Sequence, residues 1–154
     1  MEKLCKAVLS ALAGKTLVTA ESLTGGGIGA ALTGVPGSSE VYKGGIISYT
    51  NWVKENLLGV DGGVLARWGA VSAPVAEAMA RGARARLEGD IALSVTGLAG
   101  PGGDEYGNPV GTVFVGYSDE KTTLSRQFLF RGTREKVRTQ TIRAALELVL
   151  EQNQ

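Results

Sequence analysis

Hydroxyl-bearing residues and glycines follow a short apolar run near the N-terminus. The run at 17–20 continues into Glu21-Ser22-Leu23-Thr24-Gly25-Gly26-Gly27, and a helical apolar pattern begins at Ile28. This order predicts a strand, a tight turn and the start of a helix. The first N–H groups of a helix lack internal partners, so they can bind an anion, which glycines allow to approach closely. Taken alone, an ordinary strand-to-helix connection is the commoner interpretation of such a segment.

The composition restricts which nucleophiles are available. The chain has no histidine and one cysteine. Ser-His-Asp and Cys-His catalysis within the chain are therefore excluded, and histidine-based metal sites with them. A nucleophile would have to be activated by a lysine, a tyrosine, a carboxylate or a bound ion. Cys5 lies on an apolar helical stripe, which indicates a core position.

The length of the chain indicates one domain over residues 1–154. With 16 basic and 15 acidic residues, the net charge of +1 gives no argument for binding nucleic acid or a membrane. No apolar run approaches the roughly 20 residues of a transmembrane helix, and the N-terminus lacks the apolar region of a secretory signal. We therefore expect a cytoplasmic protein.

Hydrophobic periodicity predicts alternating helices and strands. Lys54 falls on a helix that begins near Thr50, and Ser72 is a candidate N-cap. Helices are predicted at 2–13, 24–34, 72–87 and 133–151, and strands at 16–20, 44–49, 91–96, 112–118 and 122–130, with a long loop at 97–111.

The order of these elements predicts an α/β fold. We expect a three-layer α/β/α domain with a mixed, mostly parallel sheet and one antiparallel hairpin near the end. Ligands of such sheets gather at the carboxyl ends of the strands, where residues 20–26, 49–54 and 96–104 should converge.

A set of short motifs runs in order through residues 5–150. They are Thr19-Ala20-Glu21-Ser22-Leu23-Thr24-Gly25-Gly26, Gly37-Ser38-Ser39, Tyr49-Thr50-Asn51 followed by Lys54, Gly69-Ala70-Val71-Ser72, Gly97-Leu98-Ala99-Gly100-Pro101-Gly102-Gly103 and Pro109-Val110-Gly111-Thr112-Val113. Together they resemble the CinA C-terminal domain family of bacterial nicotinamide mononucleotide deamidases, in its stand-alone form. The resemblance implies hydrolysis of the carboxamide of nicotinamide mononucleotide to nicotinate mononucleotide and ammonia, in pyridine nucleotide salvage. It also implies a Ser/Lys pair that needs no metal and no cofactor.

The resemblance also assigns candidate catalytic residues. Lys54 is the expected base, because burial or neighbouring cations can lower the pKa of a lysine. Ser39 is the first choice as nucleophile and Ser22 the second, and Tyr49 could orient a hydroxyl or pass a proton. The structural alternatives are a solvated Lys54, a turn role for Ser39 and a helix-capping role for Ser22.

Substrate contacts are expected along the same edge of the sheet. Arg131, Arg134 and Arg138 are candidates for the 5′-phosphate, with Arg138 preferred because it fits the family's pattern. The expected substrate-binding residues are Glu21, Thr24, Gly25, Gly26, Thr96, Gly97, Gly100 and Arg138.

Two features of the long loop depart from the family's pattern. Asn108 stands where many relatives carry a lysine, and the tip Asp104-Glu105-Tyr106 has an unusual composition. These differences bear on loop closure and substrate preference.

Two other classes of function stay open: a non-catalytic nucleotide-binding module, and a competence- or damage-associated interaction protein. A homo-oligomer is a further expectation from the resemblance.

Overall fold

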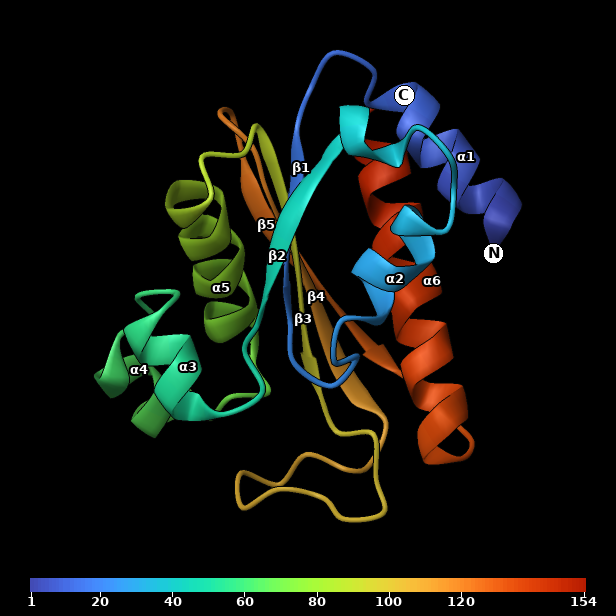
Figure 1. Cartoon of the computed structure of the whole chain (residues 1–154). Coiled ribbons are helices and arrows are strands. Elements are labelled where there is room, and N and C mark those ends of the chain that lie inside the picture. Colours follow the sequence, from blue (N-terminus) through green and yellow to red (C-terminus); the bar gives the residue numbers. More distant parts are fainter.

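One sheet lies at the centre of the structure, a computed structural model that describes all residues from 1 to 154. It contains β1 (Leu17–Glu21), β2 (Tyr42–Ile47), β3 (Ile91–Gly97), β4 (Thr112–Ser118) and β5 (Thr123–Leu129). The strand order is β2-β1-β3-β4-β5 (Figure 1). β2, β1 and β3 are parallel, whereas β4 pairs antiparallel with both β3 and β5.

Helices cover both faces of this sheet (Figure 1). On one face lie α1 (Glu2–Ala11), α2 (Gly27–Thr33) and α6 (Arg134–Gln152). On the other lie α3 (Asn51–Asn56), α4 (Gly62–Trp68) and α5 (Ala73–Arg86). A short 3-10 helix, η1 (Ser38–Glu40), precedes β2. The predicted three-layer α/β/α fold with a mixed sheet and an antiparallel hairpin is confirmed.

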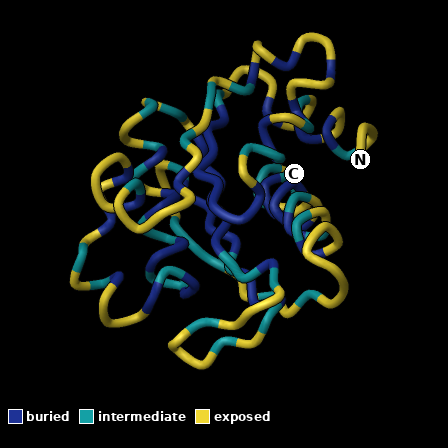
Figure 2. The backbone as a smooth tube through the Cα atoms, turned by 60° about the horizontal axis from the view of Figure 1, so that its bottom comes forward, coloured by how far each residue is buried: buried dark blue, intermediate teal, exposed yellow.

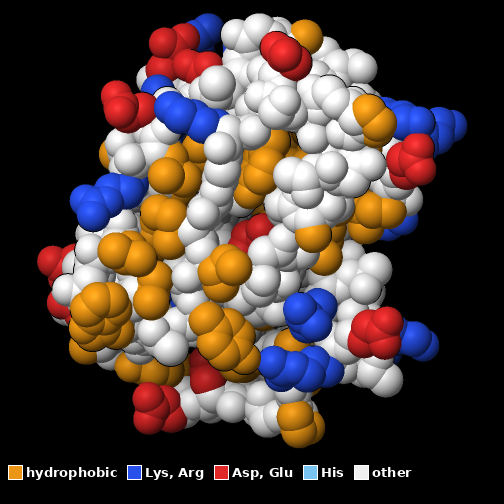
Figure 3. Space-filling view, in the orientation of Figure 1, with side chains coloured by type: hydrophobic (Ala, Val, Ile, Leu, Met, Phe, Trp, Pro, Cys, Tyr) orange, Lys and Arg blue, Asp and Glu red, His pale blue; other side chains and the backbone are white.

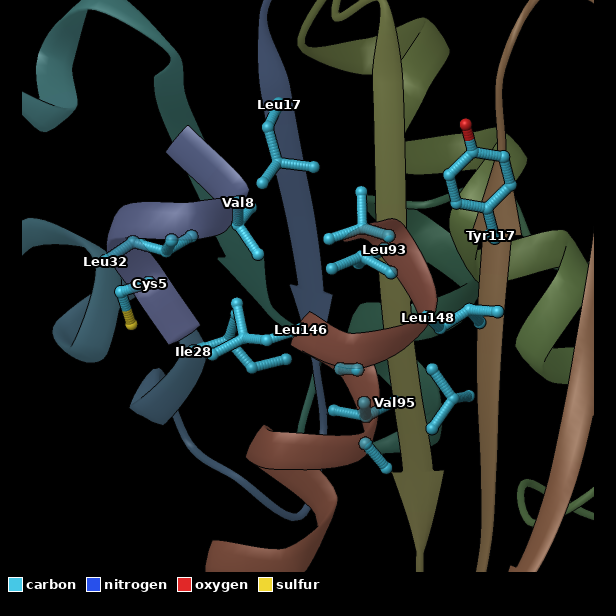
Figure 4. Close-up of a cluster of buried hydrophobic side chains, with 14 of the residues drawn as sticks. Cys5, Val8, Leu17, Ile28, Leu32, Leu93, Val95, Tyr117, Leu146 and Leu148 are labelled. Carbon is cyan, nitrogen blue, oxygen red and sulfur yellow. The ribbon is translucent and has the colours of Figure 1, made fainter. Parts of the chain in front are cut away.

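A separate hydrophobic cluster forms on each side of the sheet. The cluster under α1, α2 and α6 contains Val8, Ile28 and Leu146, which point toward the sheet in Figure 4. The cluster under α5 contains Met79 and Ala92. The interior strand β1, between β2 and β3, is buried along its whole length, as expected for a parallel strand with helices on both faces.

The start of α2 differs from its prediction. The helix predicted at 24–34 begins at Gly27, because residues 24–26 form a turn. Gly25 (φ 59°) and Gly26 (φ 103°) take left-handed backbone conformations there, which other residues rarely adopt. The turn therefore separates Ser22 from the first turn of the helix.

Helix α4 was not predicted. Its first residues, Gly62 and Gly63, are typical of a loop. Asp61 compensates as N-cap, since its carboxylate accepts hydrogen bonds from the backbone N–H groups of Gly63 (2.7 Å) and Val64 (3.2 Å).

Strand β2 lies at the edge of the sheet and carries a β-bulge. Leu17 pairs with Tyr42 whereas Val18 pairs with Gly44, which leaves Lys43 as the extra residue. Tyr42 consequently packs on the cluster under α2, and Ile46 packs on the cluster under α5.

None of the helices combines the length and apolarity that crossing a bilayer requires.

Candidate active site

A pocket of about 340 Å³ opens at the carboxyl ends of β1 and β3. It is lined from residues 22–23, 49–54, 70–71 and 96–102, and from Arg134 at the start of α6. Figure 2 turns this end of the molecule toward the viewer, with the exposed loop between β3 and β4 in front. The convergence of segments 20–26, 49–54 and 96–104 agrees with the prediction, and the wall at 70–71 is an addition to it.

Lys54 is buried beside this pocket, with 2% of its surface exposed. Helix α3 positions it, and that helix starts at the N-cap Thr50, whose hydroxyl accepts from the N–H of Val53. The ammonium donates to the carbonyl of Ser48 (2.7 Å) and to Oγ of Ser22 (3.0 Å). No carboxylate pairs with it. Burial lowers the pKa of Lys54 from its ordinary 10.5 to about 8.

Ser22 follows directly after β1 and faces the pocket. Its N–H donates to the carbonyl of Val95 on β3 (3.1 Å), and its carbonyl accepts from Gly25 (3.1 Å). These bonds fix the backbone on both sides of the hydroxyl. The next N–H groups, those of Leu23 and Thr24, have no acceptor within the protein. The turn thus presents a hydroxyl and two free donors close together.

Ser39 is not brought to Lys54. It is an exposed residue of η1, which precedes β2, whereas Lys54 follows that strand. A strand of six residues spans about 20 Å, so the two side chains belong to opposite ends of the sheet. Figure 1 shows the chain running along β2 from η1 at the top to α3 below. Of the two serines predicted as nucleophiles, only Ser22 contacts the lysine.

Glu21 caps α2 from inside the protein. One carboxylate oxygen accepts from the hydroxyl of Thr24 (2.6 Å) and the N–H of Ile28 (2.8 Å), and the other accepts from the N–H of Gly29 (3.0 Å). The helix N-terminus that was expected to bind an external anion therefore holds a carboxylate of the chain itself. Glu21 contacts neither Lys54 nor the pocket.

Arg138 braces the turn behind Ser22. Its guanidinium donates to the carbonyls of Leu23 (2.9 Å) and Thr24 (3.2 Å). Gly25 lies against the same guanidinium, and a Cβ there would stand 3.6 Å from it. Gly26 faces Ile47 instead. The preferred phosphate ligand thus has a structural role, and it does not line the pocket.

Arg134 is the arginine that lines the pocket. It donates to the carbonyl of Gly100 (2.6 Å) and to the hydroxyl of Tyr49 (3.1 Å), and so bridges two walls. Basic side chains gather at the lower centre of Figure 3, where α6 begins. Arg131 is exposed, and its side chain forms no hydrogen bond.

Thr96 and Gly97 end β3 at the floor of the pocket. The hydroxyl of Thr96 donates to the carbonyl of Ala70 (2.8 Å), which ties the strand to the wall at 70–71. A Cβ on Gly97 would meet the carbonyl of Thr112 at 2.8 Å, so glycine is needed for close packing there. Both residues line the pocket, and their predicted contacts with substrate stay a prediction; the Thr96 hydroxyl already donates to Ala70.

Sequence reasoning overlooked two parts of this site. The free N–H of Leu23 has a recognisable signal, since it belongs to the residue after a serine that directly follows a buried strand. Ala70 and Val71 carry no chemical signal, because only the tertiary fold places an apolar segment between α4 and α5 against the pocket.

Fold and pocket together define an α/β domain with a serine–lysine pair at the carboxyl ends of its parallel strands. The chain belongs to the CinA C-terminal domain family, whose model matches residues 1–153. It is 48% identical over 134 residues to a CinA-like protein of Geobacter metallireducens, covering 87% of this chain and 32% of that protein. A CinA-like protein of Parasynechococcus marenigrum is 48% identical over 150 residues, which cover 95% and 36% of the two chains. The chain thus spans about a third of the length of these curated relatives.

Solved structures of the same superfamily share the whole fold. A competence/damage inducible protein, CihA, from Agrobacterium tumefaciens is 38% identical with a TM-score of 0.95, covering 99% of this chain and 95% of that one. A CinA superfamily protein from Escherichia coli is 34% identical with a TM-score of 0.96, covering 98% and 89%.

Proposed function

We propose that this domain hydrolyses the carboxamide of nicotinamide mononucleotide, with Ser22 as nucleophile and Lys54 as base. The observation that carries the proposal is the 3.0 Å contact between Ser22 Oγ and a buried lysine amine that has no carboxylate partner. A serine hydroxyl becomes a good nucleophile only when a neighbouring base takes its proton. In a chain without histidine, this amine is the base within reach.

The protonation of Lys54 suits this role. With a pKa of about 8, about a tenth of the molecules carry the neutral amine at pH 7. The carbonyl of Ser48 accepts a hydrogen bond from the nitrogen and keeps it beside Ser22. The neutral amine then takes the Ser22 proton, and Oγ bonds to the carboxamide carbon while the carbonyl oxygen becomes an oxyanion.

The remaining steps use the same two residues. The Lys54 ammonium returns its proton to the amide nitrogen, the C–N bond breaks, and ammonia leaves an ester on Ser22. Water next gives a proton to Lys54 and attacks the ester carbon, and Ser22 leaves with the proton from Lys54. The products are nicotinate mononucleotide and the starting enzyme.

The free N–H groups of Leu23 and Thr24 are the proposed oxyanion donors. They adjoin the nucleophile and have no acceptor in the protein. A fixed donor that meets a developing oxyanion lowers the barrier by about 2.7–4 kcal/mol. Arg138 holds the carbonyls of the same turn, which keeps these N–H groups in place.

Arg134 is the proposed partner of the 5′-phosphate. Its guanidinium stands at the pocket, and the N–H groups of Ala99 and Gly100 beside it have no acceptors. Guanidinium and free backbone N–H groups together are well suited to phosphate oxygens. The proposal includes a cytoplasmic location and catalysis without a metal or other cofactor.

Ammonia release from nicotinamide mononucleotide by the purified protein tests this function. We expect turnover in the wild type and in Ser39→Ala, the matched serine control, and a loss of at least about 10³-fold in Ser22→Ala and Lys54→Ala. Mononucleotide binding without ammonia release would favour a non-catalytic module. Neither binding nor turnover, with partner capture instead, would favour the interaction role suggested by the names of the relatives.

A further inference from the structure

The loop from Leu98 to Gly111 forms one wall of the pocket with little backbone support of its own. Its base is closed by hydrogen bonds between Leu98, Gly111 and Thr112, and its tip by one long bond from Asp104 N to Asn108 O (3.4 Å). Between these points, the N–H groups of Ala99 and Gly100 are unpaired. Something other than the backbone must hold this wall in place.

Two side chains fasten the tip of the loop to the opposite wall. The Tyr106 hydroxyl donates to the carbonyl of Ala66 on α4 (2.8 Å), and its ring lies against Gly69, where a Cβ would stand 2.6 Å from the ring. The Asn108 amide donates to the carbonyl of Val71 (3.1 Å), which itself lines the pocket. Figure 1 shows the loop below the sheet with its tip turned toward α3 and α4.

Asp104 organises this fastening from within the loop. One carboxylate oxygen accepts from the N–H groups of Tyr106 (3.0 Å) and Asn108 (2.9 Å), and the other accepts from the Asn108 amide (2.8 Å). The carboxylate thereby sets the turn that aims both side chains at segment 66–71. Asp104, Tyr106 and Asn108 form one unit, called the latch below.

We propose that Asp104, Tyr106 and Asn108 are positioning residues that hold the loop over the pocket and thereby set the affinity for the substrate. The proposal rests on the amidase function proposed above and adds a role for residues outside the Ser22–Lys54 pair. The latch joins the two walls between which the substrate must fit, namely 70–71 and 98–102.

The latch acts on binding rather than on the chemical step. Ser22 is fixed by β3 through Val95, and Lys54 is fixed by Ser48. None of the latch residues contacts either catalytic side chain. Tyr106 is 44% exposed and belongs to neither hydrophobic cluster, so a change in the latch leaves the core intact. Loosening the latch should therefore raise KM and leave kcat unchanged.

The test compares Tyr106→Phe and Asn108→Ala with Glu105→Gln, an exposed neighbour that makes no hydrogen bond. Each latch variant removes a hydrogen bond between the walls, so we expect KM to rise about 3- to 10-fold. The kcat should stay within about twofold, and the pH midpoint near 8 should not move. Gly69→Ala attacks the latch from the other wall and should raise KM as well. The control should leave KM unchanged.

A second measurement separates this inference from the amidase function. In the Ser22→Ala background, calorimetry gives the Kd of nicotinamide mononucleotide without turnover. If the wild type binds the nucleotide but releases no ammonia, the amidase proposal fails and a weaker Kd in the latch variants still supports the latch. Unchanged Kd and KM in Tyr106→Phe and Asn108→Ala, a parallel fall in kcat, or no nucleotide binding by the wild type would overturn it.

Discussion

Lys54 and Ser22 stand 32 positions apart in the chain, yet their Nζ and Oγ atoms are 3.0 Å apart. The contact is made by two elements that the sheet brings together, the end of β1 and the helix after β2. Each residue is also fixed by the backbone, Ser22 through Val95 and Lys54 through Ser48. The pair is therefore assembled in the folded protein before any substrate binds.

The pH dependence of hydrolysis should follow Lys54. Because burial lowers the pKa of this lysine to about 8, the fraction of neutral amine grows about tenfold per pH unit below that value and levels off above it. We expect kcat/KM for nicotinamide mononucleotide to rise with pH to a plateau, with a midpoint near 8. A profile that is flat between pH 6 and 9 would contradict the role of Lys54 as base.

Replacing Lys54 by methionine should stabilise the protein at neutral pH while abolishing turnover. Because burial lowers the pKa of Lys54 from 10.5 to about 8, the charged amine destabilises the folded protein by about 3 kcal/mol. The hydrogen bonds of Lys54 to Ser48 and Ser22, which methionine lacks, offset part of this penalty. Urea unfolding at pH 7 should show a gain on the order of 1–3 kcal/mol.

The pH dependence of the free energy of unfolding distinguishes an effect of the Lys54 charge from a general change in packing. Between pH 8 and 10.5 the unfolded wild type binds a proton at Lys54 that the folded form has lost, so wild-type stability rises with pH there. The methionine variant lacks this rise, and the difference between the two proteins should shrink across the window. A difference that is constant between pH 8 and 10.5 would mean that Lys54 binds its proton equally well in the folded and unfolded protein, which would contradict the lowered pKa.

Arg134→Gln should weaken recognition of the substrate's phosphate. Arg134 reaches the pocket, whereas Arg131→Gln alters a cation outside it and is the matched control. We expect KM for nicotinamide mononucleotide to rise at least about tenfold, since a charge-assisted contact contributes roughly 1.5–3 kcal/mol. For nicotinamide riboside, which has no phosphate, the change should stay below about threefold. Equal losses for both substrates would assign Arg134 another role.

Glu21→Gln should destabilise the fold without changing KM. The carboxylate accepts hydrogen bonds from the hydroxyl of Thr24 and the N–H groups of Ile28 and Gly29. Glutamine replaces one of the two accepting oxygens by an NH2 group, which would face a hydrogen-bond donor and could accept nothing from it. We expect a loss of about 1–3 kcal/mol in the free energy of unfolding, measured by urea denaturation. A raised KM with unchanged stability would return Glu21 to the substrate-binding residues.

Most of the fold follows from periodicity in the sequence. Alternating strands and helices predicted the three layers, and the short gap between the strands predicted at 112–118 and 122–130 predicted the hairpin of β4 and β5. Helix α4 was missed because Gly62 and Gly63 oppose it, and its stability comes from the Asp61 cap and from Leu65 in the core. Tertiary packing outweighed a poor local propensity there.

The site was predicted in outline but not in its pairing. Composition excluded a histidine base, the family resemblance suggested Lys54 in its place, and the edge of the sheet follows from topology. The choice between Ser22 and Ser39 depends on which end of β2 each serine occupies, and that requires the register of the sheet. Arg134 and Arg138 lie on one helix, and the way in which α6 packs on the sheet decides which of the two side chains reaches the pocket.

The bulge in β2 also affects how copies of this protein meet. β2 is an outermost strand, and a regular outermost strand can pair with the same strand of another molecule. The extra residue breaks the even spacing of backbone donors and acceptors along this open edge, and the ammonium of the bulged Lys43 donates to the carbonyl of Glu88 (3.1 Å). The bulge thereby discourages strand-to-strand aggregation at the edge strand that leads to α3 and Lys54.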